Sequence, residues 1–247
     1  MSELFQLSVV IPARNESENL RLLITQIVDA LPKTQFEFEV IIVDDGSNDD
    51  SLPVLRALKK SVPELVLLRH AISMGQSAGV VSGVRHARYP WVVTLDGDGQ
   101  NDPCDIPKMV ERLQRESSDP TLWMVAGQRI KREDHWVRLF SSRIANYVRS
   151  RALKDHTPDT GCGLKLFSRE AFLLLPVFNH MHRFLPALIN RAGGKVVNQP
   201  VNHRAREKGI SNYGIGNRLW VGIIDLLGVM WLIRRCCNPV VIKDELP

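Results

Sequence analysis

The stretch VVTLDGDGQNDP, residues 92–103, joins an apolar, β-prone run to a turn that carries three carboxylates. A short apolar run that ends in turn residues is typical of a strand buried on both faces of a sheet. Asp96 and Asp98 repel each other on this turn unless a cation lies between them. Their oxygens, with the side-chain carbonyl of Gln100, are the hard ligands that Mg²⁺ or Mn²⁺ prefers. The stretch therefore predicts a strand that ends in a divalent-metal site, and Asp102 is better explained as a cap for the next helix.

Two earlier apolar runs also end in polar clusters. Residues 7–11, LSVVI, precede the cluster ARNE, and residues 38–47, FEVIIVDDGS, close in Asp-Asp-Gly-Ser. In α/β sheets, ligands bind beyond the carboxyl ends of the parallel strands. We therefore expect the three clusters to meet at one site, although an acidic turn such as DDGS is also common as a solvated cap.

Helical patterns separate these runs and continue after them. The predicted helices cover residues 18–31, a segment that ends near residue 60, and residues 75–87 and 105–116, and further strands are predicted at 64–70 and 122–129. Strands that alternate with helices predict βαβ units. The fold class is therefore α/β, with a mostly parallel sheet flanked by helices.

The composition favours one soluble α/β domain with a tail. The chain has 247 residues, 44% of them hydrophobic and 24% charged, and its net charge of +5 suits phosphates or anionic lipids without selecting either. Only 6% of residues are aromatic, and no nucleic-acid-binding module is recognised. The four cysteines show no paired CxxC spacing, and the first residues lack a secretory pattern, so we expect a cytoplasmic protein.

A helix predicted at residues 136–151 has two different faces. At about 100° per residue, its apolar residues gather on one side, and Arg138, Ser142 and Asn146 follow each other on the other at a spacing of four. Such a face is usually solvated. An arginine with a hydroxyl and an amide can also hold a phosphate through charge-assisted hydrogen bonds.

Two later segments of the sequence each allow a structural and a functional interpretation. In DTGCGLKLFSREAF, residues 159–172, a glycine-rich turn leads into a predicted helix, and Asp159 is either a helix-cap acid or an active-site acid. The basic segment HRAREKGISNY, residues 203–213, is either a solvated loop or one that folds over bound phosphates.

The segment RLWVGIIDLLGVMWLIRR, residues 218–235, predicts a C-terminal amphipathic helix. Its apolar middle is interrupted by Asp225 and is too short for a membrane span, which needs about 20 apolar residues. Tryptophans between flanking arginines are typical of a helix at a membrane surface. The alternative is a packing or oligomer-interface helix.

The ordered motifs PARNE, VDDGS and DGDGQNDP resemble those of the family 2 glycosyltransferases, which have the GT-A fold. Within that family, the chain is most similar to the polyprenyl-phosphate sugar transferases of the dolichyl-phosphate mannose synthase group. The resemblance runs from about Ser8 to Tyr213. It implies a Rossmann-like GT-A domain at residues 1–213, followed by a membrane-associating or interface helix and tail at 214–247.

The resemblance also implies a set of site residues. For nucleotide-sugar binding these are Pro12, Arg14, Glu16, Asp45, Asp96, Gly97, Asp98 and Arg206. For the metal, Mg²⁺ or Mn²⁺, they are Asp96, Asp98 and Gln100; for the acceptor phosphate, Arg129, Arg138 and Ser142; and for catalysis, Asp98, Asp159 and Arg129.

Two positions depart from the family pattern. The loop usually written G-x-S-K-Y has Asn212 in place of the lysine, a loss of one phosphate-binding charge that Arg206 or Lys208 would have to offset. A site usually written E-x-P reads Asn198-Gln199-Pro200.

The predicted function is an inverting, metal-dependent transfer of a sugar of the mannose or glucose type from a nucleoside-diphosphate sugar to a polyprenyl or dolichyl phosphate. The enzyme would be peripheral on the cytoplasmic face of the membrane, alone, as a homo-oligomer or with a membrane-protein partner. An alternative of the same fold acts on a sugar hydroxyl of a glycan or glycolipid and needs a general base such as Asp159. An alternative of another class is a non-catalytic nucleotide-sugar binder or scaffold, to which the Asn212 departure points.

Overall fold

In the computed structural model, seven strands of the described residues form one sheet in the order β3-β2-β1-β4-β6-β5-β7. The structure describes residues 4–130, 149–151, 153, 155, 157–205 and 216–237. The strands are β1 (Phe5–Ala13), β2 (Phe36–Asp44), β3 (Leu65–Arg69), β4 (Trp91–Thr94), β5 (Leu122–Arg129), β6 (Lys165–Ser168) and β7 (Lys195–Val201). All are parallel to their neighbours except β6, which runs antiparallel between β4 and β5. The predicted mostly parallel α/β sheet is therefore confirmed.

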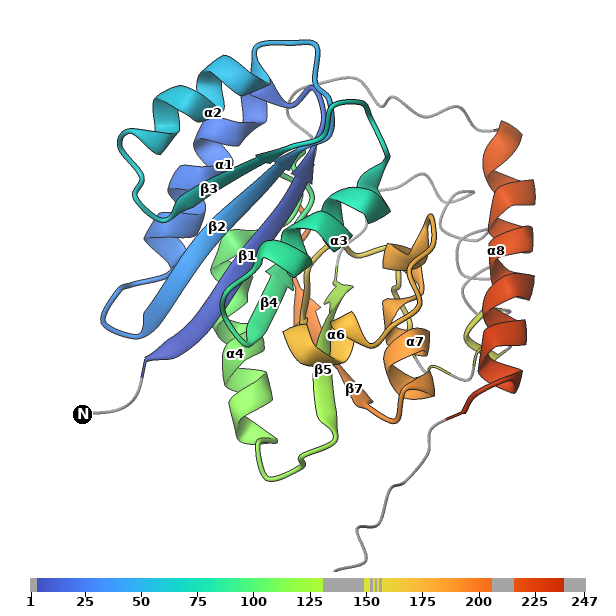
Figure 1. The fold of residues 1–247 in the computed structure, drawn as a ribbon. Coiled ribbons are helices and arrows are strands. Elements are labelled where there is room, and N and C mark those ends of the chain that lie inside the picture. Colours follow the sequence, from blue (N-terminus) through green and yellow to red (C-terminus); the bar gives the residue numbers. More distant parts are fainter. Residues whose placement is uncertain are drawn as a thin grey trace, which may run out of the picture.

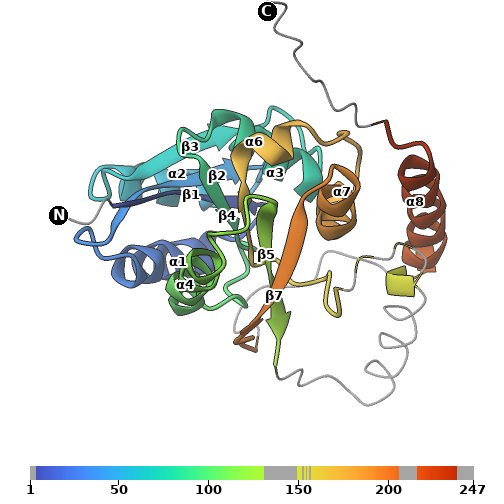
Figure 2. The same ribbon diagram turned by 90° about the horizontal axis from the view of Figure 1, so that it is seen from below.

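Helices cover both faces of the sheet (Figures 1 and 2). The helices are α1 (Ser17–Ala30), α2 (Ser51–Lys59), α3 (Gln76–His86), α4 (Ile106–Arg115), α6 (Arg169–Leu173), α7 (Leu185–Arg191) and α8 (Gly216–Arg234), with 3₁₀ turns η1 (Pro103–Asp105) and η2 (Met181–Arg183). Apolar side chains of α1, α2 and α4 form one buried core on the sheet, and those of α3, α6 and α7 form a second core. This two-layer burial explains why the central strands are apolar on both faces.

The register of the parallel strands brings their carboxyl ends to one place. Ala13 at the end of β1 pairs with Asp44 at the end of β2, and Val10 pairs with Thr94 at the end of β4. The residues that follow Thr94 therefore come level with the last residues of β1. A Cβ added to Gly97 would lie 3.2 Å from the Cβ of Ala13, which shows how closely the turn after β4 approaches β1.

Strands β6 and β7 were not predicted from the sequence. Residues 165–168, expected to belong to a glycine-rich turn and helix, instead form the four-residue strand β6, and α6 starts after the N-cap Ser168, whose Oγ accepts a hydrogen bond from the N–H of Ala171. Strand β7 contains the Asn198-Gln199-Pro200 stretch and pairs in parallel with β5. Strand β6 matters for function because its first residue, Lys165, pairs with Thr94 at the carboxyl end of β4.

Helix α8 lies at one side of the molecule, against α7 (Figures 1 and 2). Val229 is buried in the second core, and the ring of His180 bonds the carboxylate of Asp225 at 2.9 Å. Arg191 on α7 also donates to the carbonyl of Leu232 at 2.8 Å. Asp225, which interrupts the apolar segment in the sequence, therefore fastens the helix to the domain. None of the helices within the described residues has both the length and the apolar content that a bilayer crossing requires.

Candidate functional site

The turn after β2 is organised around Asp45. Its carboxylate accepts hydrogen bonds from the N–H groups of Met74 and Gly75, both at 2.8 Å, and from the hydroxyl of Ser73 at 2.7 Å. The ring of His70 bonds the same carboxylate at 2.7 Å. Burial opposes the charge, but the hydrogen bonds outweigh it and lower the pKa of Asp45. Asp45 therefore holds the loop 70–75 against the end of β2, which shapes the wall of the site.

The turns after β1 and β2 are bonded to each other. The N–H of Asn15 donates to Ser47 Oγ at 3.0 Å, and the side-chain oxygen of Asn15 accepts the N–H of Asn48 at 3.0 Å. Asn15 adopts φ 55°, a left-handed conformation that asparagine tolerates better than most residues. This cross-bonding brings the predicted nucleotide residues of both turns, among them Arg14 and Glu16, to the same end of the sheet.

The turn after β4 presents the predicted acidic pair. The side-chain amide of Gln76 donates to Oδ1 of Asp96 at 2.7 Å, and Oδ1 of Asp98 accepts the N–H of Gln100 at 3.1 Å. Close enclosure by protein, followed by the charge of Asp98, raises the pKa of Asp96 to about 6, although Lys165 and other donors act in the opposite direction. The negative charges of the two carboxylates thus repel each other, and a bound cation would remove this repulsion.

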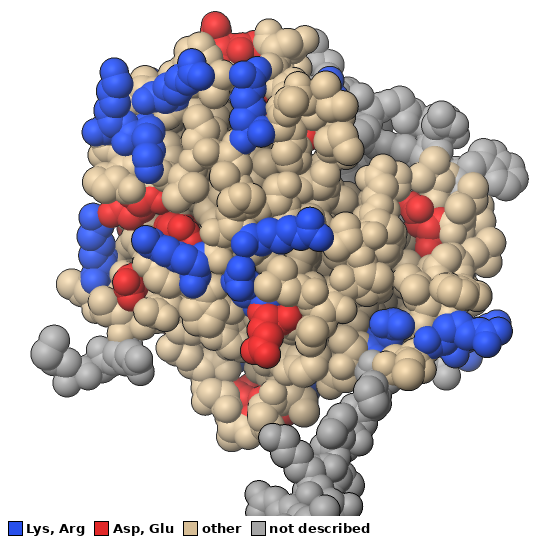
Figure 3. All heavy atoms as spheres, in the orientation of Figure 1, with Lys and Arg blue, Asp and Glu red and all other residues tan. Residues whose placement is uncertain are grey.

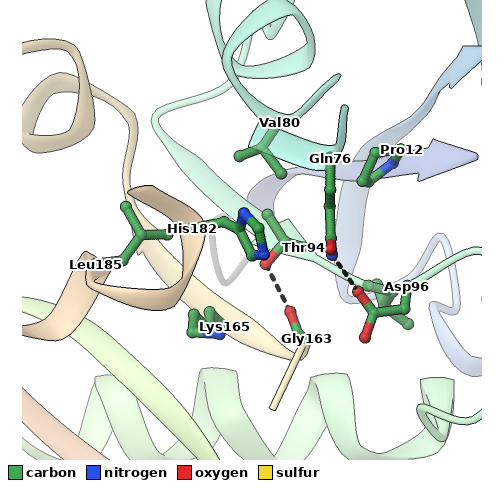
Figure 4. Close-up of a pocket in the computed structure, with 10 residues that line it drawn as sticks. Pro12, Gln76, Val80, Thr94, Asp96, Gly163, Lys165, His182 and Leu185 are labelled. Atoms are coloured by element: carbon green, nitrogen blue, oxygen red, sulfur yellow. Dashed lines mark hydrogen bonds between the residues drawn. The ribbon is translucent and has the colours of Figure 1, made fainter. Parts of the chain in front are cut away.

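A cavity of about 10 Å³ lies directly behind Asp96, roughly the space of one water molecule. Pro12, Gln76, Lys165 and His182 line it together with Asp96, and Figure 4 shows these side chains converging from separate elements. Burial lowers the pKa of Lys165, and its ammonium group donates to the carbonyl of Cys162. Burial also lowers the pKa of His182 to about 3, and its ring bonds Ser77 Oγ at 2.7 Å. The acidic turn is therefore backed by a polar wall with one buried amine.

Gly163 lets the chain pass beside the carboxylate of Asp96. A Cβ at this position would overlap the Asp96 side chain, and the carbonyl of Gly163 accepts the hydroxyl of Thr94 at 2.8 Å (Figure 4). A side chain at residue 163 would displace the carboxylate. The sequence suggested only that Gly163 meets a conformational need, and the structure shows that the need is close approach to Asp96.

The carboxylates of the acidic turn fit a divalent cation that takes most of its ligands from substrate and water. Within the described part of the chain, no three His, Cys, Asp or Glu side chains gather as a metal cluster. Mg²⁺ is commonly held by one or two carboxylates plus substrate phosphates and water. Asp96 and Asp98 supply that number. The side-chain nitrogen of Gln100 donates to the carbonyl of Arg204 at 3.4 Å, so the role of Gln100 as a third ligand stays a prediction.

Arg129 and Asp159 form a two-point ion pair at the end of β5. Nε of Arg129 donates to Oδ2 of Asp159 at 2.6 Å and Nη2 donates to Oδ1 at 2.7 Å, and the two side chains are 12% and 8% exposed. Burial alone would lower the pKa of Arg129, but the hydrogen bonds and charge of Asp159 raise it. The guanidinium therefore stays charged and oriented. The predicted acid and the predicted phosphate-binding arginine meet here as partners.

Several predicted residues fall outside the described part of the chain. They are Arg138, Ser142 and Asn146 of the predicted phosphate-binding helix, and Arg206, Lys208 and Asn212 of the basic segment. Asp102 is described, and its carboxylate accepts the N–H of Cys104 at 3.0 Å as the N-cap of η1, which confirms the predicted capping role.

Four site residues were missed from the sequence: Gln76, Lys165, His182 and Arg204. Gln76 was open to prediction, because it starts a helix after a strand of the parallel sheet, where ligands commonly bind. The others follow no spacing rule. His182 reaches Ser77 from 105 residues away in the sequence, from a 3₁₀ turn.

Comparisons with known proteins agree with this geometry. The model of the family "Glycosyl transferase family 2" matches residues 8–174. A dodecaprenyl-phosphate galacturonate synthase of Rhizobium johnstonii is 34% identical over 238 residues, which are 95% of this chain and 69% of the relative. An undecaprenyl-phosphate 4-deoxy-4-formamido-L-arabinose transferase of Edwardsiella ictaluri is 32% identical over 84% of this chain and 63% of its own length. The chain thus spans about two thirds of these curated relatives.

Solved structures give the same fold. A mannosyltransferase of Pyrobaculum calidifontis in complex with GDP-Man and Mn²⁺ superposes with a TM-score of 0.67 at 20% identity, over 96% of this chain and 67% of the other. A glucosyl-3-phosphoglycerate synthase of Mycobacterium tuberculosis in complex with Mn²⁺, UDP and phosphoglyceric acid also reaches 0.67 at 18% identity, over 96% and 80%. The sheet and the acidic strand end define the GT-A class of glycosyltransferases. Within that class, the chain belongs to glycosyl transferase family 2.

Proposed function

We propose that this glycosyltransferase moves a sugar from a nucleoside-diphosphate donor to a polyprenyl phosphate, with a divalent metal and with inversion at the anomeric carbon. One observation carries the proposal: the Asp96–Asp98 pair stands at the carboxyl end of β4, level with the end of β1 and beside the cross-bonded turns that follow β1 and β2. The curated relatives, both named for transfer to a polyprenyl phosphate, support this acceptor class.

The donor would lie across the ends of β1, β2 and β4. Pro12, the second-last residue of β1, and Arg14 and Glu16, which follow the strand, would face the base and ribose of the donor. Asp45 would act there through the loop 70–75 that it holds. The diphosphate would lie over Asp96, Gly97 and Asp98. Arg206 would reach the same phosphates from the basic segment.

Asp96 and Asp98 would hold the Mg²⁺ or Mn²⁺ ion, which supplies charge stabilisation for the departing diphosphate. The hydrogen bond from Gln76 orients the carboxylate of Asp96, and the buried Lys165 offsets part of its charge. Preorganised groups of this kind need no reorganisation when charge develops in the transition state, which makes them effective in catalysis.

The Arg129–Asp159 pair supports a phosphate rather than a hydroxyl as acceptor. A hydroxyl acceptor needs a general base, whereas a phosphate is already anionic at neutral pH. Both oxygens of Asp159 accept hydrogen bonds from Arg129, which suits an acid that orients a guanidinium. Arg129 would then bind the acceptor phosphate, with Arg138 and Ser142 joining it from the predicted helix.

The decisive experiment incubates labelled donor and Mn²⁺ with bacterial membranes and treats the extracted lipid with mild acid. A glycosyl phosphate linked to a polyprenyl chain is expected to release its label. An acid-stable glycolipid would instead identify a hydroxyl acceptor, and donor binding without turnover would identify a non-catalytic binder.

The donor sugar is the finer part of the proposal. Mannose and glucose are the sugars predicted from the sequence, while the relatives are named for galacturonate and 4-deoxy-4-formamido-L-arabinose. Thermal shift with GDP-mannose, UDP-glucose and UDP-galacturonate, each with and without Mn²⁺, ranks these donors because stabilisation follows affinity. We expect the preferred donor to stabilise the protein only when metal is present.

We further propose that α8 rests on the membrane surface where a polyprenyl phosphate is found. Exposed apolar side chains lie along it, with Ile224 66%, Leu227 59% and Trp231 60% exposed. Basic side chains gather at the C-terminal end of α8 in the view of Figure 3, as a helix at an anionic surface requires. The cytoplasmic face stays a prediction from the sequence, as does the choice between lipid contact and an oligomer interface.

Vesicle flotation tests the membrane proposal. Leu227→Ser should weaken binding to vesicles that contain anionic lipid, because it removes apolar area from the lipid-facing side. Leu22→Ser on α1 is the matched control, since Leu22 is 55% exposed and lies on another helix. Equal flotation of the two variants would contradict lipid contact at Leu227, and a change of mass in light scattering for Leu227→Ser alone would favour the oligomer interface.

A further inference from the structure

The guanidinium of Arg204 joins segments that are far apart in the sequence. Nη1 donates to the side-chain oxygen of Gln26 on α1 at 2.8 Å, and Nη2 donates to Oδ1 of Asp102 at 2.6 Å. The backbone N–H of Arg204 donates to the carbonyl of Gln100 at 2.9 Å, and the side chain of Gln100 donates back to the carbonyl of Arg204. Arg204 therefore bonds both α1 and the last residues of the acidic turn.

The contact continues into the acidic turn. Next to Arg204, His203 forms an antiparallel bridge with Asn101, and the side-chain oxygen of Asn101 accepts the N–H of Asp96 at 3.0 Å. Asp102, the partner of Arg204, is also the N-cap of η1. The segment 203–204 is thus linked, through Asn101 and Asp102, to both ends of the turn that carries Asp96 and Asp98.

The geometry of these bonds points to orientation more than to bulk stability. The side chains of Arg204 and Asp102 are 36% and 14% exposed, and an ion pair that solvent reaches contributes little to stability on its own. An arginine fork that bonds two acceptors on two elements instead fixes their relative position. Groups of this kind behind a metal ligand commonly set its geometry.

We propose that Arg204 is a positioning residue, which fixes the acidic turn 96–102 relative to the chain that leads from β7 into the basic segment. Arg204 would thereby hold the carboxylates of Asp96 and Asp98 in one place for the metal and the diphosphate. This inference rests on the proposed function of the acidic turn.

Arg204→Gln removes the fork and keeps most of the side-chain length. We expect the KM for the metal–donor complex to rise about tenfold, the usual cost of losing a group that orients a ligand, while kcat changes by less than twofold. Arg204→Lys keeps the charge but can serve only one of the two acceptors well, so its KM should lie between those of the wild type and Arg204→Gln. Equal KM values for wild type and Arg204→Gln would overturn the proposal.

Arg112→Gln is the matched control. The side chain of Arg112 is 38% exposed and lies 2.6 Å from a carboxylate, as does that of Arg204, but its partner is Glu116 beside α4. We expect this variant to keep the KM of the wild type. A similar rise in KM for both variants would mean that a surface arginine matters only for general stability, and the positioning role would be lost.

Hydrogen exchange separates a failure of this inference from a failure of the proposed function. Arg204→Gln should speed exchange of the N–H groups of residues 96 and 204 at least tenfold, because their acceptors, the side chain of Asn101 and the carbonyl of Gln100, belong to the turn that the guanidinium holds through Asp102. Arg112→Gln should leave both unchanged. The measurement needs no substrate, so unchanged exchange in Arg204→Gln refutes the positioning role even if no donor is bound. Faster exchange with no turnover of any donor by the wild type would support the contact and refute the transferase.

Discussion

The turns after β2 and after β4 look alike in the sequence, since each places two aspartates beside a glycine at the end of a buried strand. In the structure the two turns differ in which groups offset the negative charge of the aspartate. Asp45 receives hydrogen bonds from four groups of the loop 70–75, which lower its pKa. Asp96 receives the amide of Gln76 and faces Asp98, and its pKa rises to about 6. The same acidic pattern therefore serves as an internal brace in one turn and suits a cation in the other.

The largest expected effect comes from removing a carboxylate of the second turn. Asp98→Asn should lower kcat/KM by about a thousandfold, because on the proposed function Asp98 would be a charged ligand of the metal that offsets charge on the departing diphosphate. Its stability should equal or slightly exceed that of the wild type, since the repulsion with Asp96 disappears. Initial rates and urea unfolding measure the two quantities.

Asp29→Asn, at an exposed position of α1, is the control for that substitution and should leave both quantities unchanged. If Asp98→Asn kept wild-type turnover with Mn²⁺, the acidic turn would not be the metal site, and the difference between the two turns would have no functional meaning.

The complementary change in the first turn should affect folding. Asp45→Asn replaces an acceptor-only side chain by one that carries an NH₂ group among four donors, so at least one donor is left unsatisfied. We expect a loss of about 3 kcal/mol in the free energy of unfolding, the upper part of the range for hydrogen bonds to a charged group. Urea denaturation beside Asp98→Asn measures the contrast. Equal stability of the two variants would remove the distinction between brace and cation site.

Much of this contrast lies beyond what the sequence can predict. The three strand ends were predicted to meet, because apolar runs and polar turns are local patterns and parallel topology aligns their ends. Two of the hydrogen bonds to the Asp45 carboxylate come from backbone N–H groups of the loop 70–75. Residue types do not reveal such bonds, because almost every residue has a backbone N–H. Lys165 enters the site because the four-residue strand β6 lies antiparallel between β4 and β5. A run of four residues is too short for its hydrophobic periodicity to be recognised in the sequence.

Two glycines give a smaller and sharper test of the same contrast. Gly163→Ala pushes a methyl group into the carboxylate of Asp96, so we expect kcat/KM to fall about thirtyfold, with a cost of about 1–3 kcal/mol in stability from overpacking. Gly46→Ala places a Cβ 2.9 Å from the backbone nitrogen of Ser73 at φ +67°, and should reduce stability by a similar amount.

The two glycine variants should therefore differ in activity per folded molecule. Rates at 10 °C, corrected for the folded fraction from circular dichroism, measure this quantity. Gly222→Ala in α8 is the control, because nothing lies within 4 Å of its added Cβ, and it should keep full activity. A large loss of activity per folded molecule in Gly46→Ala, matching that of Gly163→Ala, would show that both turns act directly on the reaction.

The smallest expected effect concerns the wall behind the second turn. Burial lowers the pKa of His182 from 6.5 to about 3, so the unfolded chain binds a proton between these values and the folded chain does not. The contribution of a neutral His182 is thus fully present above pH 6.5 and is lost as the pH falls toward 3. Between pH 7.5 and pH 5, the protonation of His182 should lower the free energy of unfolding by about 1 kcal/mol, less than the full pKa difference gives because His182 is only half-buried. Asp96, with its raised pKa, acts in the opposite direction over the same range, so the wild type alone is not informative. The comparison with His182→Asn is informative, because the free energy of unfolding of the variant should fall less between pH 7.5 and pH 5 than that of the wild type. Urea unfolding at the two pH values measures both. An identical fall in the two proteins would mean that another group of the wall binds the proton.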